Sequence, residues 1–234
     1  MPVFALSEEI VFPNPRLARS DGLLAVGGDL TRERLLLAYR RGIFPWFSAG
    51  EPILWWSPNP RLLLFPGRMH VSRSLARTLR RGRFTFTMDR AFPRVMELCG
   101  KLREEEGPGT WITPDMLEAY TGLHAAGLAH SVETWEAGEL VGGLYGVSLG
   151  RCFFGESMFH LSPDASKAAL AALSGQLAQW GFHFIDCQMI TPHLLSLGAM
   201  PVARNDFLTL LEHSLSLPDR RGKWAFAQVT DRIG

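Results

Sequence analysis

Proline and glycine interrupt the pattern of apolar and polar positions over the first sixty residues. One helix is predicted there, with Thr31 placed to cap it, Leu35 on its apolar face and Gly42 at its end. The segment that follows, GIFPWFSAGEPILWWSPNPR (42–61), has too many prolines for regular structure. It predicts an aromatic-rich loop, and we therefore expect a small N-terminal domain over residues 1–62.

The remainder of the chain alternates between periods typical of helices and of strands. Helices are predicted over residues 91–104, 113–123, 162–177, 191–198 and 206–215. Strands are predicted over residues 84–89, 130–136, 139–149, 151–159, 182–189 and 223–229. This order predicts an α/β fold with a mixed sheet over residues 63–234, and it is the element order of acetyltransferases of the N-acetyltransferase (GNAT) type.

Composition excludes several classes of protein. Of the 234 residues, 47% are apolar and 20% are charged, so the chain is not mainly disordered. No apolar run approaches the ~18 residues that a membrane-spanning helix needs, and the N-terminus lacks the pattern of a secretory signal. Three cysteines without CxxC spacing predict neither a disulfide framework nor a zinc ribbon. We expect a cytoplasmic protein that does not contact a membrane.

The net charge of +1 conceals a segregation of charge along the chain. Residues 61–103 hold eleven Lys and Arg against two Asp and Glu, a charge of +9, whereas the rest holds 13 against 21, a charge of −8. Such a basic sector is typical of a surface that binds an anion. Ten of the eleven are arginines, which suit forked contacts with phosphate.

A further helix is predicted within this sector, between Ser72 as its N-cap and Gly82 as its end. Val71, Leu75 and Leu79 recur every four residues and mark its buried stripe. Three arginines lie on another face: Arg73, Arg77 and Arg80. A solvated helix face and a contact with an RNA backbone explain this pattern equally well.

Polar residues interrupt two apolar strands. Glu156 lies in FFGESMF, and Asp186 and Gln188 lie two apart in FIDCQ, so these two share one face while Cys187 points to the other. A carboxylate and an amide are costly to bury without partners. If the two strands are neighbours, the three groups would form a polar cluster suited to proton transfer. A hydrogen-bonded pair that closes a sheet edge is the alternative.

Other patterns are weaker. Seven histidines without HExxH do not predict a zinc hydrolase, and AVGGDL and LVGGLYG match neither a Walker loop nor GxGxxG. Cys187 with His193 would make a nucleophile pair, but Cys187 faces away from the acid and is expected to be a packing thiol. Ser157 lacks a GxSxG setting. Indoles in loops suit stacking on a terminal base.

The chain resembles the leucyl/phenylalanyl-tRNA–protein transferases over nearly its whole length. The strings that carry the resemblance follow in the family's order: DGLLAVGGDL, AYRRGIFPWFS, LWWSPNPR, HVSRSL, GTWIT, AHSVETW, LVGGLYG, FFGESMF, ASKAAL and DCQ…HLLSLGA. The resemblance implies transfer of Leu, Phe or, less well, Met from aminoacyl-tRNA to the α-amine of proteins that begin with Arg or Lys, which marks them for N-end-rule degradation. It implies an acetyltransferase-like C-terminal domain and no metal, ATP or other cofactor. We expect a monomer.

The resemblance also implies roles for individual residues. Asp186 would hold and help deprotonate the amine, and Gln188 and Glu156 would complete a hydrogen-bond relay; hydroxyl groups of the tRNA are an alternative proton acceptor. The terminal adenosine would stack between Trp46 and Trp111. Arg73, Arg77 and Arg80 would hold the tRNA backbone. The side chain of the donor amino acid would enter an apolar pocket formed by Leu144, Phe153, Met158, Leu170, Leu173 and Ile185.

Two rival functions share some of these features. An acyl-CoA N-acetyltransferase has the same element order but needs a pyrophosphate loop, Q/R-x-x-G-x-G/A, where this chain has SPDASK. A non-catalytic RNA-binding module would account for the basic sector and the tryptophans. It would have no use for Glu156, Asp186 and Gln188 together.

Overall fold

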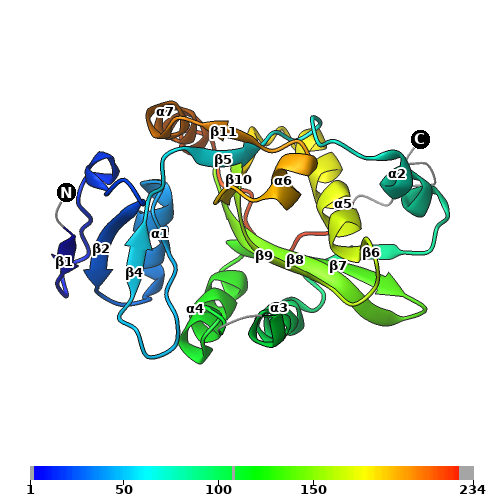
Figure 1. Ribbon diagram of the computed structural model, residues 1–234, viewed down its shortest axis with the longest axis horizontal. Helices are drawn as coiled ribbons and strands as arrows, with labels where there is room; N and C mark the ends of the chain where they lie inside the picture. Colours follow the sequence, from blue (N-terminus) through cyan, green and yellow to red (C-terminus); the bar gives the residue numbers. More distant parts are fainter. Residues whose placement is uncertain (1–2, 107–108, 227–234) are drawn as a thin grey trace.

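Two β-sheets organise the chain in the computed structural model, which describes residues 3–106 and 109–226 (Figure 1). The smaller sheet has the order β1-β2-β4-β3. Its strands are β1 (Phe4–Leu6), β2 (Leu23–Gly27), β3 (Phe44–Pro45) and β4 (Leu54–Trp56). A 3-10 turn (Pro15–Leu17) and helix α1 (Arg32–Arg40) complete this part of the molecule.

The predicted first helix is confirmed as α1, and Thr31 caps it by accepting a hydrogen bond from the backbone of Arg34. The prediction that 42–61 is irregular is wrong in part, because this segment contains β3 and β4. Pro45 is compatible with a strand here because β3 lies at the edge of the sheet. The indole of Trp55 is fully buried and donates its Nε1–H to the carbonyl of Gly27 over 2.8 Å.

The larger sheet is mixed, with the order β11-β5-β10-β9-β8-β7-β6. Its strands are β5 (Arg61–Leu64), β6 (Thr85–Met88), β7 (Ala129–Glu136), β8 (Glu139–Leu149), β9 (Cys152–His160), β10 (Phe184–Gln188) and β11 (Met200–Val202). Strands β9 and β10 are parallel neighbours, and the other pairs are antiparallel. The predicted α/β class with a mixed sheet is confirmed.

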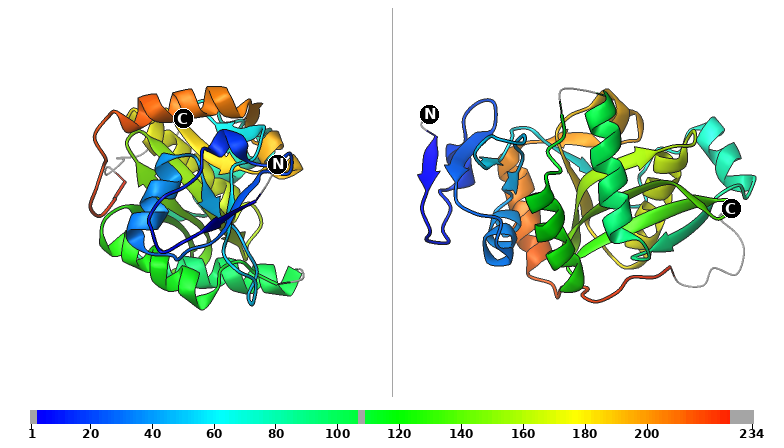
Figure 2. Two further views of the ribbon diagram at one scale, coloured as in Figure 1. Left: turned by 90° about the vertical axis from the view of Figure 1, so that its left-hand side faces the viewer. Right: turned by 90° about the horizontal axis from the view of Figure 1, so that it is seen from below.

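Helices cover both faces of this sheet. The helices of this part of the chain are α2 (Arg73–Arg80), which packs against α5, and α3 (Phe92–Glu106), α4 (Pro114–Ala125), α5 (Ala165–Gln179), α6 (Pro192–Ser196) and α7 (Arg204–Leu215). Helices α3 and α4 pack on one face and α5 on the other, as the views from the front and from below show (Figures 1 and 2). Each face has its own apolar core.

Several details differ from the sequence prediction. Val71 is 40% exposed and does not belong to the buried stripe of α2, whereas Leu75 is buried. Helix α5 begins at Ala165, and Asp164 precedes it in a left-handed conformation without a side-chain cap. The strand predicted over 223–229 is wrong for residues 223–226, which form no strand; residues 227–229 lie outside the described residues. Trp224 instead packs in the core on the α5 face.

The proposed domain boundary after residue 62 stays a prediction. Strand β5 (Arg61–Leu64) of the larger sheet straddles it, and one core cluster contains side chains from both sheets, such as Trp55 and Phe154. Among the residues that the structure describes, no helix has the length and apolar character needed to cross a bilayer.

Candidate active site

Two β-bulges lie where β9 and β10 diverge. The two strands pair in register up to Asp186 opposite Phe154. In β9, Ser157 and Gly155 pair with consecutive residues of β8, so Glu156 is the extra residue of a bulge. In β10, Asp186 and Gln188 pair with consecutive residues of β5, so that strand is bulged as well. Bulges of this kind re-aim side chains, and they are common beside active sites.

The bulges bring the three polar residues together, as the sequence predicted. Gln188 donates from Nε2 to Glu156 Oε1 over 3.1 Å and from its backbone N–H to Asp186 Oδ1 over 3.0 Å. The expected alternation of side chains along a regular strand does not explain why Asp186 and Gln188 meet. The register shifts between these two residues, and Gln188 has a φ of +54°. The backbone bond to the Asp186 carboxylate holds Gln188 in this left-handed conformation. We call Glu156, Asp186 and Gln188 the polar cluster.

Arg61 is a member of the site that the sequence analysis missed. Its Nε and Nη2 donate to the two carboxylate oxygens of Asp186 over 2.8 and 2.7 Å, and both side chains are fully buried. The guanidinium lies 4.7 Å from the ring centroids of both Phe44 and Phe207, and its Nη1 donates to the carbonyl of Gly42 over 3.2 Å. Arg61 was counted in the basic surface sector, which is wrong for this residue.

Two buried tyrosines complete the surroundings of Glu156. Tyr120 donates its hydroxyl to Glu156 Oε2 over 3.3 Å, and the hydroxyls of Tyr39 and Tyr120 are hydrogen-bonded to each other. Burial raises the pKa of Glu156 to about 7, against the opposing effect of a hydrogen bond with Tyr39. Burial, with the nearby Glu156 carboxylate, also holds the pKa values of both tyrosines well above 10. Glu156 therefore titrates near neutral pH.

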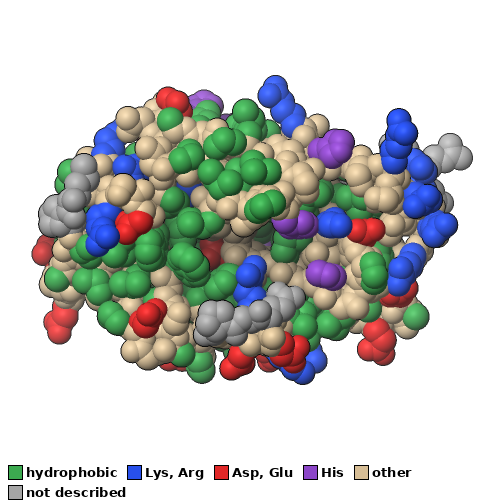
Figure 3. Space-filling model, viewed as in Figure 1, with side chains coloured by type: hydrophobic (Ala, Val, Ile, Leu, Met, Phe, Trp, Pro, Cys, Tyr) green, Lys and Arg blue, Asp and Glu red, His purple; other side chains and the backbone are tan. Residues whose placement is uncertain are grey.

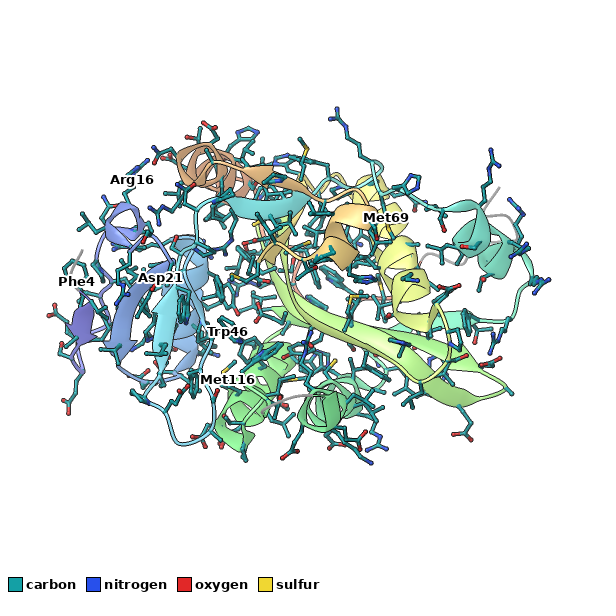
Figure 4. The ribbon with its side chains drawn as sticks, viewed as in Figure 1. Phe4, Arg16, Asp21, Trp46, Met69 and Met116 are labelled. Atoms are coloured by element: carbon teal, nitrogen blue, oxygen red, sulfur yellow. The ribbon has the colours of Figure 1, made fainter. Side chains whose placement is uncertain are left out.

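The structure also contains an aromatic cavity of about 580 Å³, and we define it by Trp46, Leu54, Trp56, Arg103, Thr110 and Trp111. Figure 4 shows Trp46 between the two sheets. The indoles of Trp46 and Trp111 meet edge to face, with centroids 6.3 Å apart and planes at 82°. The guanidinium carbon of Arg103 lies over the Trp111 ring, 4.4 Å from the ring centroid, and Arg103 Nε lies 3.5 Å from Ser157 Oγ. Ser157 follows Glu156 directly in the chain. Arg103 therefore links this cavity to the bulge of β9.

The six residues predicted for the donor pocket gather in one apolar cluster on the α5 face of the sheet. Five of them are buried in it and Met158 packs against it, half-buried: Leu144, Phe153, Met158, Leu170, Leu173 and Ile185. A second cavity, of about 420 Å³, is lined by Met158 but by none of the other five. The assignment of these residues to a pocket stays a prediction.

The three arginines predicted to contact RNA are all exposed on α2. Ser72 caps this helix and Leu75 anchors it, as predicted. Figure 3 shows basic side chains gathered over α2, at the right-hand end of the molecule. The weaker candidates stay unsupported: burial raises the pKa of the Cys187 thiol far above its usual value. The described residues contain no group of three or more His, Cys, Asp or Glu that could hold a metal ion.

Comparison with known proteins identifies the chain's relatives. Residues 63–212 match the family model described as leucyl/phenylalanyl-tRNA protein transferase, and residues 28–59 match that of its N-terminal domain. The chain is 62% identical to the leucyl/phenylalanyl-tRNA–protein transferase of Desulfatibacillum aliphaticivorans over 96% of its own length and 97% of that protein. It is 52% identical to the protein of the same name from Myxococcus xanthus (strain DK1622), over 99% of its own length and 100% of that protein.

Similar solved structures are more distant. An aminoglycoside acetyltransferase from an uncultured soil metagenomic sample matches 50% of this chain and 86% of its own, with 14% identity and a TM-score of 0.39. The L-PGS of Bacillus licheniformis matches 70% of this chain and 51% of its own, with 14% identity and a TM-score of 0.40.

Proposed function

Because the chain belongs to the leucyl/phenylalanyl-tRNA–protein transferase family, we propose that it transfers Leu, Phe or, less well, Met from aminoacyl-tRNA to the α-amine of proteins that begin with Arg or Lys. The observation that carries the proposal is the hydrogen-bonded polar cluster, which adjoins an apolar cluster and is linked through Ser157 and Arg103 to an aromatic cavity. These are the three environments that an amine, a terminal base and an apolar side chain require.

The reaction needs little chemical activation. The aminoacyl ester is already activated, so the enzyme has to orient the acceptor amine and move one proton. The amine nitrogen forms an amide with the carbonyl carbon, and the bond from that carbon to the ribose oxygen breaks. The nitrogen loses a proton and the departing ribose oxygen gains one. A group that titrates near neutral pH and can both accept and return a proton suits this step.

We assign the proton acceptor to Glu156, whose pKa of about 7 suits it for this role. The Asp186 carboxylate already accepts two hydrogen bonds from Arg61 and one from the backbone of Gln188, so little of it is free for the amine. Asp186 then acts as a positioning residue that holds Gln188, and Gln188 in turn orients Glu156. Arg61 balances the charge of Asp186, so Glu156 supplies the negative charge that favours acceptors beginning with Arg or Lys.

The donor would be held at three places. Its amino-acid side chain would enter between residues of the apolar cluster on the α5 face, from the side of Met158. Its terminal adenine would stack on one of the indoles of the aromatic cavity and meet the other by its edge, since Trp46 and Trp111 are nearly perpendicular. The exposed arginines of α2 would contact phosphates farther along the RNA.

We place this reaction in the cytoplasm, where aminoacyl-tRNA is available and where the free thiols of Cys99, Cys152 and Cys187 remain reduced. The transferred residue would mark its target for N-end-rule degradation. We also propose that residues 1–62 and 63–234 are two domains, with the aromatic cavity between them supplied by both, as Trp46 and Trp111 illustrate.

A competition assay tests the donor class. The protein is incubated with a peptide that begins with Arg and with either labelled Phe-tRNA or labelled acetyl-CoA. We expect label from Phe-tRNA alone, and excess unlabelled acetyl-CoA should not reduce it. Labelling from acetyl-CoA without tRNA would identify an N-acetyltransferase instead. Binding of tRNA without transfer to any peptide would favour an RNA-binding module.

A further inference from the structure

Four basic side chains contribute to the lining of the cavity of about 420 Å³ beside Met158. We call it the basic cavity. Four of its groups come from four different elements, α3, β9, α5 and α6: Arg103, His160, Lys167 and His193. Residues that are 7 to 90 positions apart in the chain converge here, so the cavity is a product of the tertiary fold and not of one charged helix.

Acidic groups balance this cavity only in part. Asp164 also lines it, and it accepts a hydrogen bond from Lys167 Nζ over 2.9 Å. Because Asp164 pairs with Lys167, no acidic side chain in the lining balances the charge of Arg103, nor any positive charge on His160 and His193. Burial, together with the charges of Lys167 and His160, lowers the pKa of His193. These basic groups therefore lie close enough to repel one another. An anion bound between them would offset this repulsion.

The basic cavity connects the two regions that the proposed function assigns to the donor RNA. Arg103 lines both it and the aromatic cavity. On its other side, Asp164 is 3.4 Å from the hydroxyl of Thr78 in α2, the helix that carries the three exposed arginines. A strand of RNA whose terminal base lies against the tryptophans would pass over this cavity on its way to α2.

We propose that the basic cavity binds a backbone phosphate of the single-stranded 3′ end of the donor RNA, with Lys167, His160 and His193 as its donors. The proposal rests on the proposed function, since it takes the terminal base to lie in the aromatic cavity. A peptide that begins with Arg or Lys is disfavoured in this position because its charges would meet those of Lys167 and Arg103. The phosphate would fix the distance between the terminal nucleotide and the rest of the tRNA.

Two small donors distinguish this role from others. Phenylalanyl-adenosine has no phosphate, whereas phenylalanyl-cytidylyl-adenosine has one, next to its terminal nucleoside. Transfer to a peptide that begins with Arg is measured with both donors for wild type, Lys167→Met and His193→Gln. Lys101→Met serves as the control, because Lys101 is an exposed lysine of α3 that lines neither cavity.

We expect Lys167→Met to raise KM for the dinucleotide donor about tenfold, the effect of one charged hydrogen bond, and His193→Gln to raise it less. KM for phenylalanyl-adenosine should change less than about twofold in both variants, and the control should match wild type. An equal loss with both donors, or a raised KM for the peptide in place of the donor, would overturn the proposal. So would an unchanged KM with the dinucleotide.

Binding without chemistry keeps the proposal separate from the proposed function. The affinities of unacylated cytidylyl-adenosine and adenosine are compared by calorimetry. We expect the dinucleotide to bind more tightly than adenosine to wild type and to lose this advantage in Lys167→Met. If wild type transfers from neither donor, the proposed function fails, and this comparison still decides whether the cavity holds a phosphate; equal affinities for the two ligands would show that it does not.

Discussion

Arg61 and Asp186 form a two-point ion pair that is completely shielded from solvent, with donor–acceptor distances of 2.8 and 2.7 Å. The pair joins the start of β5 to the middle of the neighbouring strand β10 and so ties one member of the polar cluster to β5. Breaking such a pair from one side leaves a buried charge without a partner, whereas replacing both partners with apolar residues is often tolerated. Asp186, which positions Gln188 in the polar cluster, is therefore also a structural residue.

Asp186→Ala should abolish transfer and leave tRNA binding of the folded protein near normal, because α2 and the aromatic cavity remain. It should also lower the free energy of unfolding by about 3–5 kcal/mol, because Arg61 is left unpaired. Urea unfolding and single-turnover transfer measure the two effects. The double variant Arg61→Leu with Asp186→Leu separates them: we expect it to regain stability and remain inactive. Turnover near that of wild type in either variant would remove Asp186 from the mechanism.

Glu156→Gln should change the pH dependence of transfer as well as its rate. In wild type both Glu156, with its pKa of about 7, and the acceptor amine, with a pKa near 8, must lose a proton before reaction. Well below both values, log kcat/KM should rise with a slope approaching 2 per pH unit. In the variant only the amine titrates, so the slope should be 1. An identical slope in both proteins would show that Glu156 is not the proton acceptor.

The same variant should alter the pH dependence of stability. Folding raises the pKa of Glu156 from its ordinary 4.5 to about 7, so the native state binds this proton more tightly than the unfolded state does. The resulting stabilisation is complete below about pH 4.5 and is lost as the pH rises through about 7. Wild type should therefore lose stability relative to Glu156→Gln between pH 5 and pH 8 in urea unfolding. A constant difference would contradict the raised pKa.

Replacing Arg73, Arg77 and Arg80 with Ala should raise KM for aminoacyl-tRNA and reduce its salt dependence. Each lost phosphate contact lowers the slope of log affinity against log salt by about 0.9, so three contacts would lower it by about 3. Transfer from phenylalanyl-adenosine should be unaffected. Replacing the exposed Arg19 and Arg32, which lie outside α2, with Ala provides the control. Equal losses with tRNA and with the minimal donor would show that α2 does not contact the RNA backbone.

Leu170→Ala should shift donor preference towards bulkier side chains. Removing this side chain opens space in the apolar cluster, and we expect the ratio of kcat/KM for Phe-tRNA over Leu-tRNA to rise roughly tenfold, within the ~1–3 kcal/mol that such pockets supply. Leu177→Ala is the matched control, since Leu177 lies on the same helix and in the same cluster but is not assigned to the pocket. An unchanged ratio in Leu170→Ala would refute the pocket assignment.

Local patterns were sufficient to predict much of the fold. Capping residues and apolar spacing predicted α1, α2 and α4 correctly. The capping side chains Thr31, Ser72 and Thr113 each accept a hydrogen bond from a backbone N–H in the first turn of their own helix. Alternation located β7, β8 and β9. The four-residue β5 and three-residue β11 were missed because so short a strand has little periodicity of its own. The strand predicted around Trp224 is wrong because burial among other aromatic rings produces the same apolar pattern as a buried strand.

The polar cluster was predictable in its members but not in its partners. Acids and amides inside apolar strands stand out in a sequence, and Glu156, Asp186 and Gln188 do meet. Arg61 is 125 residues from Asp186, and nothing local distinguishes it from the surface arginines that follow it. The bulge at Glu156 likewise depends on its pairing with β8, so the contact with Tyr120 could not be read from strand alternation.

In the proposed reaction an apolar aminoacyl group is passed to a cationic chain terminus beside Glu156. Mass spectrometry of an Arg-starting peptide and of an otherwise identical Glu-starting peptide, after incubation with Phe-tRNA, tests it most directly. We expect the mass of one added phenylalanine on the α-amine of the Arg peptide and none on the Glu peptide. Equal addition to both, addition to a side chain, or no addition to the Arg peptide would contradict it.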